Sequence, residues 1–362
     1  MTYFRAKERI YVRPILSNYK TKKSLKLKKL PIYFDKVEVI KRLKKTISKK
    51  IFFLDRLDDL NLEDKKFVLN KLELLQSPYK QLKSLKLEIP KIMGILNVTP
   101  DSFSDGGKYD EPTYAFRHYK KMISEGADII DIGGESTRPG SKTVAVKKEI
   151  ERILPVLKKV KTLKKNNVLI SLDTRKSKVA AELKGKGVDI INDVSGLRYD
   201  KNMMEFLKKN NFPFVLMHSI SNPLNMQSKI NYQNVLLDVY DFFEKRIAKC
   251  NEMGISSSNI IIDPGIGFGK TVKQNFTLIK NIALFHSLGC PLLLGASRKS
   301  FIGKLSKNNL NHNRIGGSLS SVVYGLSQGV SIFRVHDVHE TKQAIKLYLN
   351  LRWKKNILEL MA

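Results

Sequence analysis

The sequence predicts an α/β fold, a (β/α)8 or TIM barrel with a small N-terminal accessory region. From residue 91 onward, short apolar runs rich in β-branched residues alternate with amphipathic segments, which is the rhythm of strands followed by helices. Eight such runs occur over about 260 residues, the number and length expected of this barrel. The runs are apolar throughout, as in parallel strands that are covered on both faces.

Each predicted strand ends at a polar or glycine-rich segment. The strands are expected at residues 92–96, 128–132, 168–172, 188–191, 213–217, 260–262, 292–294 and 331–334. In a barrel, the segments that follow the strands meet at one mouth. The polar residues expected there are Asn97, Asp131, Asp173, Asn192, His218, Asp263, Ser297, Arg298, Lys299, Arg334 and His336. One such Asp or Asn is commonly a helix N-cap, but polar residues after every strand indicate a functional site.

Residues 1–90 differ in character from the rest of the chain. They are rich in lysine, contain no glycine and lack apolar runs that end in Asp, Asn or Gly. Within them, residues 37–43 suggest a short helix or strand, and residues 60–75 have helical periodicity. We therefore expect an accessory region at 1–90, of open role, and a catalytic barrel at 91–362.

The composition is that of a folded globular protein. The 362 residues are 42% hydrophobic and 28% charged, which excludes a disordered or collagen-like chain. The net charge of +32 would attract a nucleic acid, an anionic membrane or a phosphorylated substrate, and charge alone does not choose among them. The lysines are spread along the chain instead of forming one arginine-rich patch, so we expect a solvated basic surface and no nucleic-acid partner.

Cysteine usage and hydropathy predict a cytoplasmic protein without a membrane partner. Cys250 and Cys290 cannot form a disulfide framework, and no Cys/His pair has zinc-finger spacing. The first residues lack the apolar core of a signal peptide, and no later stretch reaches the roughly 18 apolar residues of a membrane span.

The polar residues at the predicted mouth suit a flat, phosphorylated heterocycle. Asp173, Asn192, Asp263 and Lys299 offer acceptors and donors to amide-like and amidine-like edges. Arg298, Lys299, Arg334 and His336 place cationic donors after the last two strands, where barrels often bind phosphate. The alternative roles are an N-cap near Ser177 for Asp173 and a solvated loop position for Lys299.

Two loops at the mouth carry further polar groups. Residues 97–105 bear oxygen side chains followed by two glycines, which suits Mg2+ shared with a substrate phosphate, although an ordinary polar turn is the alternative. Residues 133–140 add a hydroxyl and a guanidinium. Two loops here, residues 97–108 and 138–143, are expected to close over the site and exclude water.

The segment 263–271, DPGIGFGKT, is not a phosphate-binding P-loop. That motif needs a glycine at the position of Pro264. Phe268 between glycines is better interpreted as an aromatic wall for a ring. We expect His218, His286, His312 and His339 to be structural, and no Ser/His/Asp or Cys/His nucleophilic set is present.

Two long motifs, IMGILNVTPDSFSDGG at 92–107 and GADIIDIGGESTRP at 126–139, resemble the signatures of the dihydropteroate synthase family. The resemblance extends over about residues 91–345 through LDTRK at 172–176, INDVSG at 191–196, MH at 217–218, IDPGIGFG at 262–269, GASRKSFIG at 295–303 and RVH at 334–336. It implies a folate-pathway transferase that joins 4-aminobenzoate to (7,8-dihydropterin-6-yl)methyl diphosphate and releases diphosphate. It also implies the barrel fold, a homodimer and Mg2+ as cofactor.

The resemblance also implies roles for individual residues. The pterin pocket would be formed by Asp173, Asn192, Met217, Asp263, Gly267, Phe268 and Lys299. The diphosphate would contact Thr137, Arg334 and His336, and the metal would be held by Asn97, joined by Asp105. The 4-aminobenzoate site would be formed by Phe103, Thr137, Pro139, Lys299 and Ser300, with Arg138 added to the substrate-binding residues. Asp173, Lys299, Arg334 and His336 would be the catalytic set.

Two other functions remain as alternatives. A methyltetrahydrofolate:corrinoid methyltransferase barrel shares the pterin-binding Asp and Asn, but residues 97–105 and 297–301 resemble diphosphate and Mg2+ machinery that methyl transfer does not need. The basic region 1–90 could bind nucleic acid with a steep salt dependence. It is too short, and lacks the motifs, for a fused pyrophosphokinase or aldolase, so docking on the barrel or lengthening a dimer interface is the favoured role.

Overall fold

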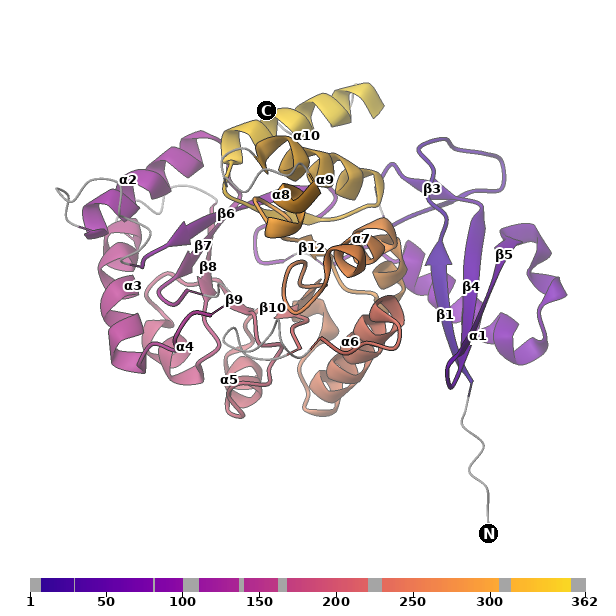
Figure 1. Ribbon diagram of the computed structural model, residues 1–362, viewed down its shortest axis with the longest axis horizontal. Coiled ribbons are helices and arrows are strands. Elements are labelled where there is room, and N and C mark those ends of the chain that lie inside the picture. The colour runs from indigo at the N-terminus through magenta and orange to yellow at the C-terminus, as the bar shows by residue number, and fades with distance from the viewer. Residues whose placement is uncertain are drawn as a thin grey trace, which may run out of the picture.

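A computed structural model describes residues 8–28, 30–80, 82–99, 111–136, 140–161, 168–220, 230–305 and 314–352. In it, an eight-stranded parallel sheet is surrounded by helices, and a small antiparallel sheet lies beside it (Figure 1). The first of these parts is the predicted barrel, and the second is built from the N-terminal residues.

The barrel strands follow each other around the sheet in chain order. They are β6 (Lys91–Asn97), β7 (Ile129–Gly133), β8 (Leu169–Asp173), β9 (Ile190–Asp193), β10 (Phe214–Met217), β11 (Ile260–Asp263), β12 (Leu293–Leu294) and β13 (Ile332–Val335). β13 pairs with β6, and a parallel bridge between Ile262 and Leu292 joins β11 to the segment of β12. The closed ring confirms the predicted (β/α)8 barrel, and every strand lies within about two residues of its predicted position.

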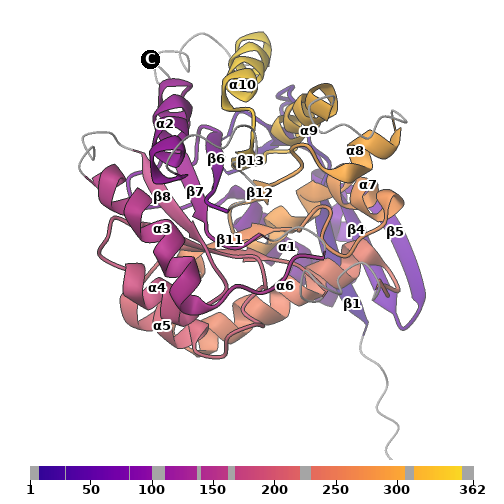
Figure 2. The same cartoon turned by 60° about the vertical axis from the view of Figure 1, so that its left-hand side comes forward.

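The helices cover the outside of this ring (Figure 2). They are α2 (Glu111–Ser124), α3 (Val146–Lys161), α4 (Ser177–Leu183), α5 (Met203–Asn210), α6 (Val235–Glu252), α7 (Val272–Lys280), α8 (Ser300–Leu305), α9 (Ile315–Ser327) and α10 (Val338–Arg352), with short 3-10 helices η3 (Ser257–Asn259) and η4 (Ile282–Leu288). Local sequence fixes several starts. Asn234 caps α6 by accepting from Leu237 N, and Thr271 with Gln274 forms a capping box at α7.

The amino-terminal end of the barrel is closed by apolar side chains. One buried residue from each strand forms a layer there: Met93, Ile129, Leu169, Ile190, Val215, Ile261, Leu293 and Ile332. Leu82, Leu85 and Leu87, from the segment before β6, pack under this layer. The polar strand ends therefore lie at the opposite, carboxyl-terminal mouth, where barrel enzymes carry their active sites.

The N-terminal region forms a three-stranded antiparallel sheet and one long helix. The sheet order is β1 (Arg9–Pro14), β4 (Lys36–Leu43) and β5 (Thr46–Phe53), and a short hairpin joins β2 (Leu25–Lys26) to β3 (Tyr33–Phe34). The 3-10 helix η1 (Leu54–Asp59) leads into α1 (Leu62–Gln76). Residues 37–43 are thus a strand, and the helical periodicity at 60–75 corresponds to α1.

This sheet is docked on the barrel through both apolar and charged contacts. The Tyr11 ring packs edge-on against Tyr240 of α6, with 5.2 Å between centroids, and its hydroxyl donates to Asp241 at 3.0 Å. Arg42 of β4 pairs with Asp238 of α6 at 2.7 Å. Buried residues of the sheet and the barrel belong to one continuous hydrophobic core.

Cys250 and Cys290 are both buried and free. Among the residues that the structure describes, no helix combines the length and apolar character needed to cross a membrane.

Candidate active site

Three neighbouring strands bring polar side chains together at the barrel mouth. Asp131 lies within β7, Asp173 ends β8, and Asn192 lies in β9 directly opposite Asp173 in the register. All three side chains are buried. Gly133 lies opposite Asp173, and a Cβ at this glycine would come within 3.3 Å of the Asp173 Cβ, so the small residue leaves room for the carboxylate.

Arg334 of β13 reaches across to this cluster. Its Nε donates to Asp131 Oδ2 at 2.7 Å, and its Nη2 donates to Asp173 Oδ2 at 2.9 Å. Asn192 Nδ2 donates to the same Asp131 oxygen at 2.9 Å. Asp131 therefore links the cluster, although the sequence analysis placed it at the mouth without giving it a role. Its other oxygen, Oδ1, is buried without a partner among the described residues.

Burial dominates the electrostatics of Asp173. Desolvation by burial, followed by the nearby Asp131 charge, raises the pKa of its carboxyl to about 8 in spite of the opposing Arg334 charge. Asp173 does not cap α4, because Asp200 Oδ2 accepts from Ser177 N at 2.7 Å at the start of that helix. The alternative N-cap role for Asp173 is therefore wrong.

Asp263 and Lys299 form the other side of the site. Asp263 ends β11, and its Oδ1 accepts from Gly265 N at 2.8 Å. Burial raises the pKa of Asp263, with opposition from the Gly265 N–H and the Lys299 charge. Burial and the Arg334 charge lower the pKa of Lys299 to about 8, although Asp263 and Asp173 favour its charged form. Lys299 therefore belongs to the same charge cluster and is not a free loop lysine.

The site has an apolar side. Met217 and Phe268, both predicted for this pocket, pack together with Val194 in a small cluster. The Lys299 Nζ lies 4.2 Å from the centre of the Phe268 ring. Gly267 has φ +84°, and a Cβ there would meet Lys299 Cδ at 3.1 Å, so a glycine is required by both backbone and space. The sequence analysis missed Val194, whose one signal was its place just after the fourth strand.

The loop that carries Gly267 and Phe268 is fixed from beneath by Lys270. Its buried ammonium donates to the carbonyls of Gly265 and Phe268, both at 2.9 Å, and lies 3.1 Å from His218 Nδ1. Burial lowers the pKa of Lys270 to about 7. This lysine therefore holds the loop, in agreement with the interpretation that the glycine-rich segment is not a P-loop.

His336 lies beside Ser297 at the ends of the last two strand segments. Ser297 Oγ is 3.1 Å from His336 Nδ1 and accepts from His336 N at 3.2 Å. Arg298 Nε donates to Asp337 Oδ2 at 3.0 Å, which directs this guanidinium to a carboxylate of the chain itself. Ser300 is exposed at the start of α8, next to Lys299 in the chain.

A buried ionic network connects the segment after β7 with the segment after β8. Lys176 Nζ pairs with both Glu135 and Glu149, and Arg175 Nη2 pairs with Glu135 Oε1 at 2.7 Å. Thr174 Oγ1 donates to Glu149 Oε1 at 2.7 Å. Sequence reasoning missed this network. The available signal was Glu135 directly after Gly134, and Arg175 with Lys176 shortly after Asp173.

Several predicted residues cannot be placed. Phe103, Asp105, Thr137, Arg138, Pro139 and His312 lie outside the described residues. Asn97 is described: it ends β6, pairs in register with Gly133 and is half-buried. Within the described ranges, no group of three or more His, Cys, Asp or Glu side chains could hold a metal ion.

Comparisons with known proteins agree with this geometry. A family model described as "Pterin binding enzyme" matches residues 93–336. The dihydropteroate synthase of Escherichia coli strain K12 is 43% identical over 264 residues, which cover 73% of this chain and 92% of that protein.

Two solved structures of the dihydropteroate synthase from Xanthomonas albilineans share the fold. The one with 4-aminobenzoic acid has a TM-score of 0.70 and 36% identity, covering 75% of this chain and 96% of that one. The one with 7,8-dihydropteroate has a TM-score of 0.69 and 33% identity, covering 76% of this chain and 100% of that one. With the family match over the barrel, these similarities confirm the resemblance seen in the sequence: the chain belongs to the dihydropteroate synthase family of pterin-binding transferases.

Proposed function

We propose that this chain joins 4-aminobenzoate to (7,8-dihydropterin-6-yl)methyl diphosphate through the residues clustered at the barrel mouth, giving 7,8-dihydropteroate and diphosphate. The observation that carries the proposal is the pairing of buried carboxylates, an amide and a cation with the apolar Met217–Phe268 wall. Solved relatives that contain 4-aminobenzoic acid and 7,8-dihydropteroate support it. They are dihydropteroate synthases, so the methyltransferase alternative has no support among them.

The pterin ring would be recognised by its hydrogen-bonding edges and its faces. Asp263 and Asp173 accept parallel N–H groups, and the Asn192 amide offers one acceptor besides the N–H that it donates to Asp131. The Lys299 ammonium donates to ring acceptors, and Phe268 with Met217 covers a ring face. Because these side chains are buried or half-buried, each contact forms in a site shielded from water, where it is stronger than in bulk solvent.

The reaction exchanges one bond for another at the methylene carbon. The aniline nitrogen of 4-aminobenzoate uses its lone pair to form the new C–N bond and then loses a proton, while the C–O bond breaks and its electron pair leaves with diphosphate. The electron-rich pterin stabilises the positive charge that develops at the methylene. Arg334 has N–H groups left after its bonds to Asp131 and Asp173, and with His336 and Thr137 it is proposed to hold the leaving group, while Arg138 is proposed as a further substrate-binding residue.

Phe103, Thr137, Pro139, Lys299 and Ser300 are proposed to hold 4-aminobenzoate. Lys299 would then lie between the two substrates, since it also contacts the pterin wall. Closure of the two loops over the mouth is proposed to keep water from the reactive methylene.

Mg2+ is the proposed cofactor, with Asn97 as its protein ligand and Asp105 joining it. Asn97 fits: its half-buried side chain stands at the end of β6 and makes no hydrogen bond to another described residue. A single amide oxygen is enough, because Mg2+ bound to a phosphate keeps waters and few protein ligands. The ion would supply neutralisation of the charge on the departing diphosphate.

We expect Asn97→Leu to raise the Mg2+ concentration that gives half-maximal turnover by about tenfold, because one oxygen ligand is lost. Turnover titrated with Mg2+ after chelation measures this, and affinity for a pterin without diphosphate is the control and should not change. An unchanged Mg2+ requirement would contradict the assignment of Asn97.

His336 is expected to act as a neutral imidazole. Burial, followed by the charges of Arg334, Arg298 and Lys299, lowers its pKa to about 3, which keeps it uncharged in the free protein at physiological pH. The ring signals of His336, assigned by comparison with His336→Gln, should therefore stay constant in an NMR titration from about pH 5 to pH 8. A titration step near pH 6.5 would contradict this electrostatic picture.

Three broader proposals accompany this one. The chain divides into an accessory region at 1–90 and a barrel at 91–362, and it forms a homodimer. Exposed apolar side chains on the adjacent helices α9 and α10, such as Val323 and Leu347, support the dimer. Analytical ultracentrifugation would measure the mass of the particle in solution. A cytoplasmic location stays a prediction from the sequence.

The reaction itself is tested by following diphosphate release from the dihydropterin diphosphate with Mg2+, with and without 4-aminobenzoate. Release that depends on 4-aminobenzoate, with dihydropteroate identified by mass, is the expected result. A protein that binds the pterin but forms no dihydropteroate under any Mg2+ concentration would contradict the proposal.

A further inference from the structure

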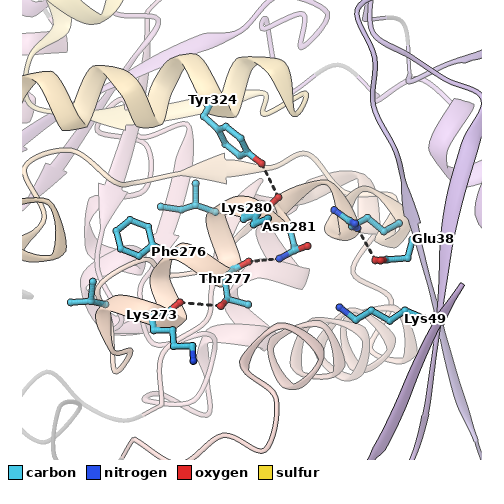
Figure 3. A pocket seen from close by; sticks show the side chains of 11 residues that line it. Glu38, Lys49, Lys273, Phe276, Thr277, Lys280, Asn281 and Tyr324 are labelled. Carbon is cyan, nitrogen blue, oxygen red and sulfur yellow. Dashed lines mark hydrogen bonds and ion pairs between the residues drawn. The ribbon is translucent and has the colours of Figure 1, made fainter. Parts of the chain in front are cut away.

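A cavity of 1090 Å³ lies between the N-terminal sheet and two helices of the barrel (Figure 3). Arg13, Glu38 and Lys49 line it from β1, β4 and β5. The barrel side is formed by α7, the residue that follows it and Tyr324 of α9. The cavity therefore exists only because the N-terminal sheet is docked beside α7. It is separate from the mouth of the barrel, and none of the proposed catalytic residues lines it.

Two aromatic rings on the barrel side are incompletely covered. Phe276 of α7 and Tyr324 of α9 are each 37% exposed, a high value for such large side chains next to a cavity. The Tyr324 hydroxyl donates to the carbonyl of Lys280 at 2.8 Å, which fixes the direction of its ring (Figure 3). Val272 and Ile279 extend this apolar wall. The wall offers flat surfaces on which a planar ring can pack.

The polar part of the lining is strongly cationic. Arg13 and Glu38 neutralise each other, with Arg13 Nε 2.9 Å from Glu38 Oε2. Lys49, Lys273 and Lys280 remain, and these three exposed lysines form no ion pair with any residue in the described ranges. Lys49 extends from β5 and Lys273 from α7, so positive charge faces the cavity from both the sheet and the barrel (Figure 3).

We infer that this cavity binds a small polyanion that carries a planar ring, the chemistry of a nucleoside triphosphate. The three lysines suit phosphate groups, and the Phe276 and Tyr324 rings suit a base. The volume lies slightly above the usual range for small-molecule sites. The inference goes beyond the proposed reaction, which uses neither these residues nor such a ligand.

The site is a property of this chain's architecture. Arg13, Glu38 and Lys49 lie outside residues 93–336, the part that matches the pterin-binding family. Without the sheet, only the part of the lining from α7, Asn281 and Tyr324 would remain. The ligand would thus be held between the accessory sheet and the enzyme, which gives the N-terminal region a binding role besides its docking contacts.

The test measures the affinity of the full chain for ATP by calorimetry. The titration is done in the presence of saturating 7,8-dihydropteroate. The product is added to fill the pterin and 4-aminobenzoate parts of the barrel mouth, so that the base of ATP cannot bind there. The double variant Lys49→Gln/Lys273→Gln is compared with Lys50→Gln. Lys50 is the matched control, since it neighbours Lys49 on β5, is equally exposed and points to the opposite face, over Phe52.

We expect ATP to bind more tightly than about 1 mM and the double variant to weaken it by about tenfold, with Lys50→Gln unchanged. Adenosine and inorganic triphosphate should each bind about tenfold more weakly than ATP. Adenosine keeps only the contacts with the aromatic rings, and triphosphate keeps only the contacts with the lysines. Both mutated lysines are exposed, and circular dichroism verifies that the variants fold.

Three results would overturn the inference. ATP binding that is absent, or equal in the wild type and the double variant, would remove the site. Triphosphate that binds as tightly as ATP would remove the ring from the assignment. A double variant that changes only the sedimentation coefficient would assign this face to a second copy of the chain. Each of these outcomes is independent of dihydropteroate formation, so the proposed reaction and this site fail separately.

Discussion

Lys299→Ala should lower kcat/KM for the dihydropterin diphosphate by about a hundred- to a thousandfold, because a charged donor to a buried ligand is lost. Lys299 lies over the Phe268 ring and is coupled electrostatically to Asp263 and Asp173. Removing its charge would leave these carboxylates less compensated when the pterin arrives. Steady-state kinetics with each substrate varied in turn measures the effect.

The control for this variant is Lys304→Ala. Lys304 lies in the last turn of α8, is exposed and belongs to the same segment of chain. Its replacement should leave kcat/KM within about twofold of the wild type, since exposed charges away from the site contribute little. Lys299→Arg should restore part of the activity, because the charge returns with a different shape. Equal activity of Lys299→Ala and the wild type would remove Lys299 from the site.

Asp173→Asn should abolish most activity, by about a thousandfold in kcat/KM, while leaving the fold as stable as before. The carboxylate form of Asp173, which hydrogen bonds from the pterin N–H groups favour, is the proposed acceptor, and the amide keeps the size of the carboxyl without being able to ionise. Arg334 loses one of its two carboxylate partners and keeps Asp131. Kinetics and thermal unfolding at the same pH give the two readouts.

The stability readout separates a binding role from a structural one. The folded-state pKa of Asp173 is raised to about 8 from the ordinary value of 3.8. The free energy of unfolding therefore falls as pH rises from about 4 to 8, because the carboxyl ionises in the unfolded chain while it stays protonated in the folded one. A neutral Asn at pH 7.5 avoids this loss, and the unfolding temperature should be unchanged or higher. A variant that unfolds at a lower temperature in proportion to its loss of activity would show that Asp173 supports the fold instead.

The barrel could be predicted from the sequence because each of its strands has a recognisable pattern of residues. A parallel strand that is covered on both faces must be a continuous apolar run, and the polar residue after it stands out. The start of β9 shows the limit of this reasoning. Val188 continues the apolar pattern, but Asp189 uses its side chain to accept from Ile170 N at 2.9 Å, and the strand begins at Ile190.

The N-terminal sheet could not be predicted in the same way. A hairpin is usually recognised by Gly or Asn in its turn, and residues 1–90 contain no glycine. The turn between β4 and β5 instead places Lys44 at φ +53°, a left-handed conformation that lysine rarely adopts. Residues 37–43 suggested a short helix or strand without deciding between them. The packing of Tyr11 on Tyr240 depends on contacts between distant parts of the chain.

Within the site, the sequence predicted which residues lie at the mouth better than it predicted the hydrogen bonds between them. Asp173, Asn192, Asp263, Lys299 and Arg334 are together at the mouth, as expected from their places after the strands. The bridge from Arg334 to Asp131 joins residues 203 positions apart and depends on the length of one side chain across the barrel. The role of Lys270 was equally hidden, because a lysine after a glycine-rich run gives no sign that it turns inward to bind carbonyls.

The most direct test of the central claim is a crystal structure of the full chain with 7,8-dihydropteroate bound. We predict that the pterin ring lies against Phe268 and Met217, with its N–H edge on the carboxylates of Asp173 and Asp263 and with Lys299 within hydrogen-bonding distance of the ring. A pterin that binds elsewhere, or that occupies the mouth without contacting Asp173, Asp263 or Lys299, would contradict the account.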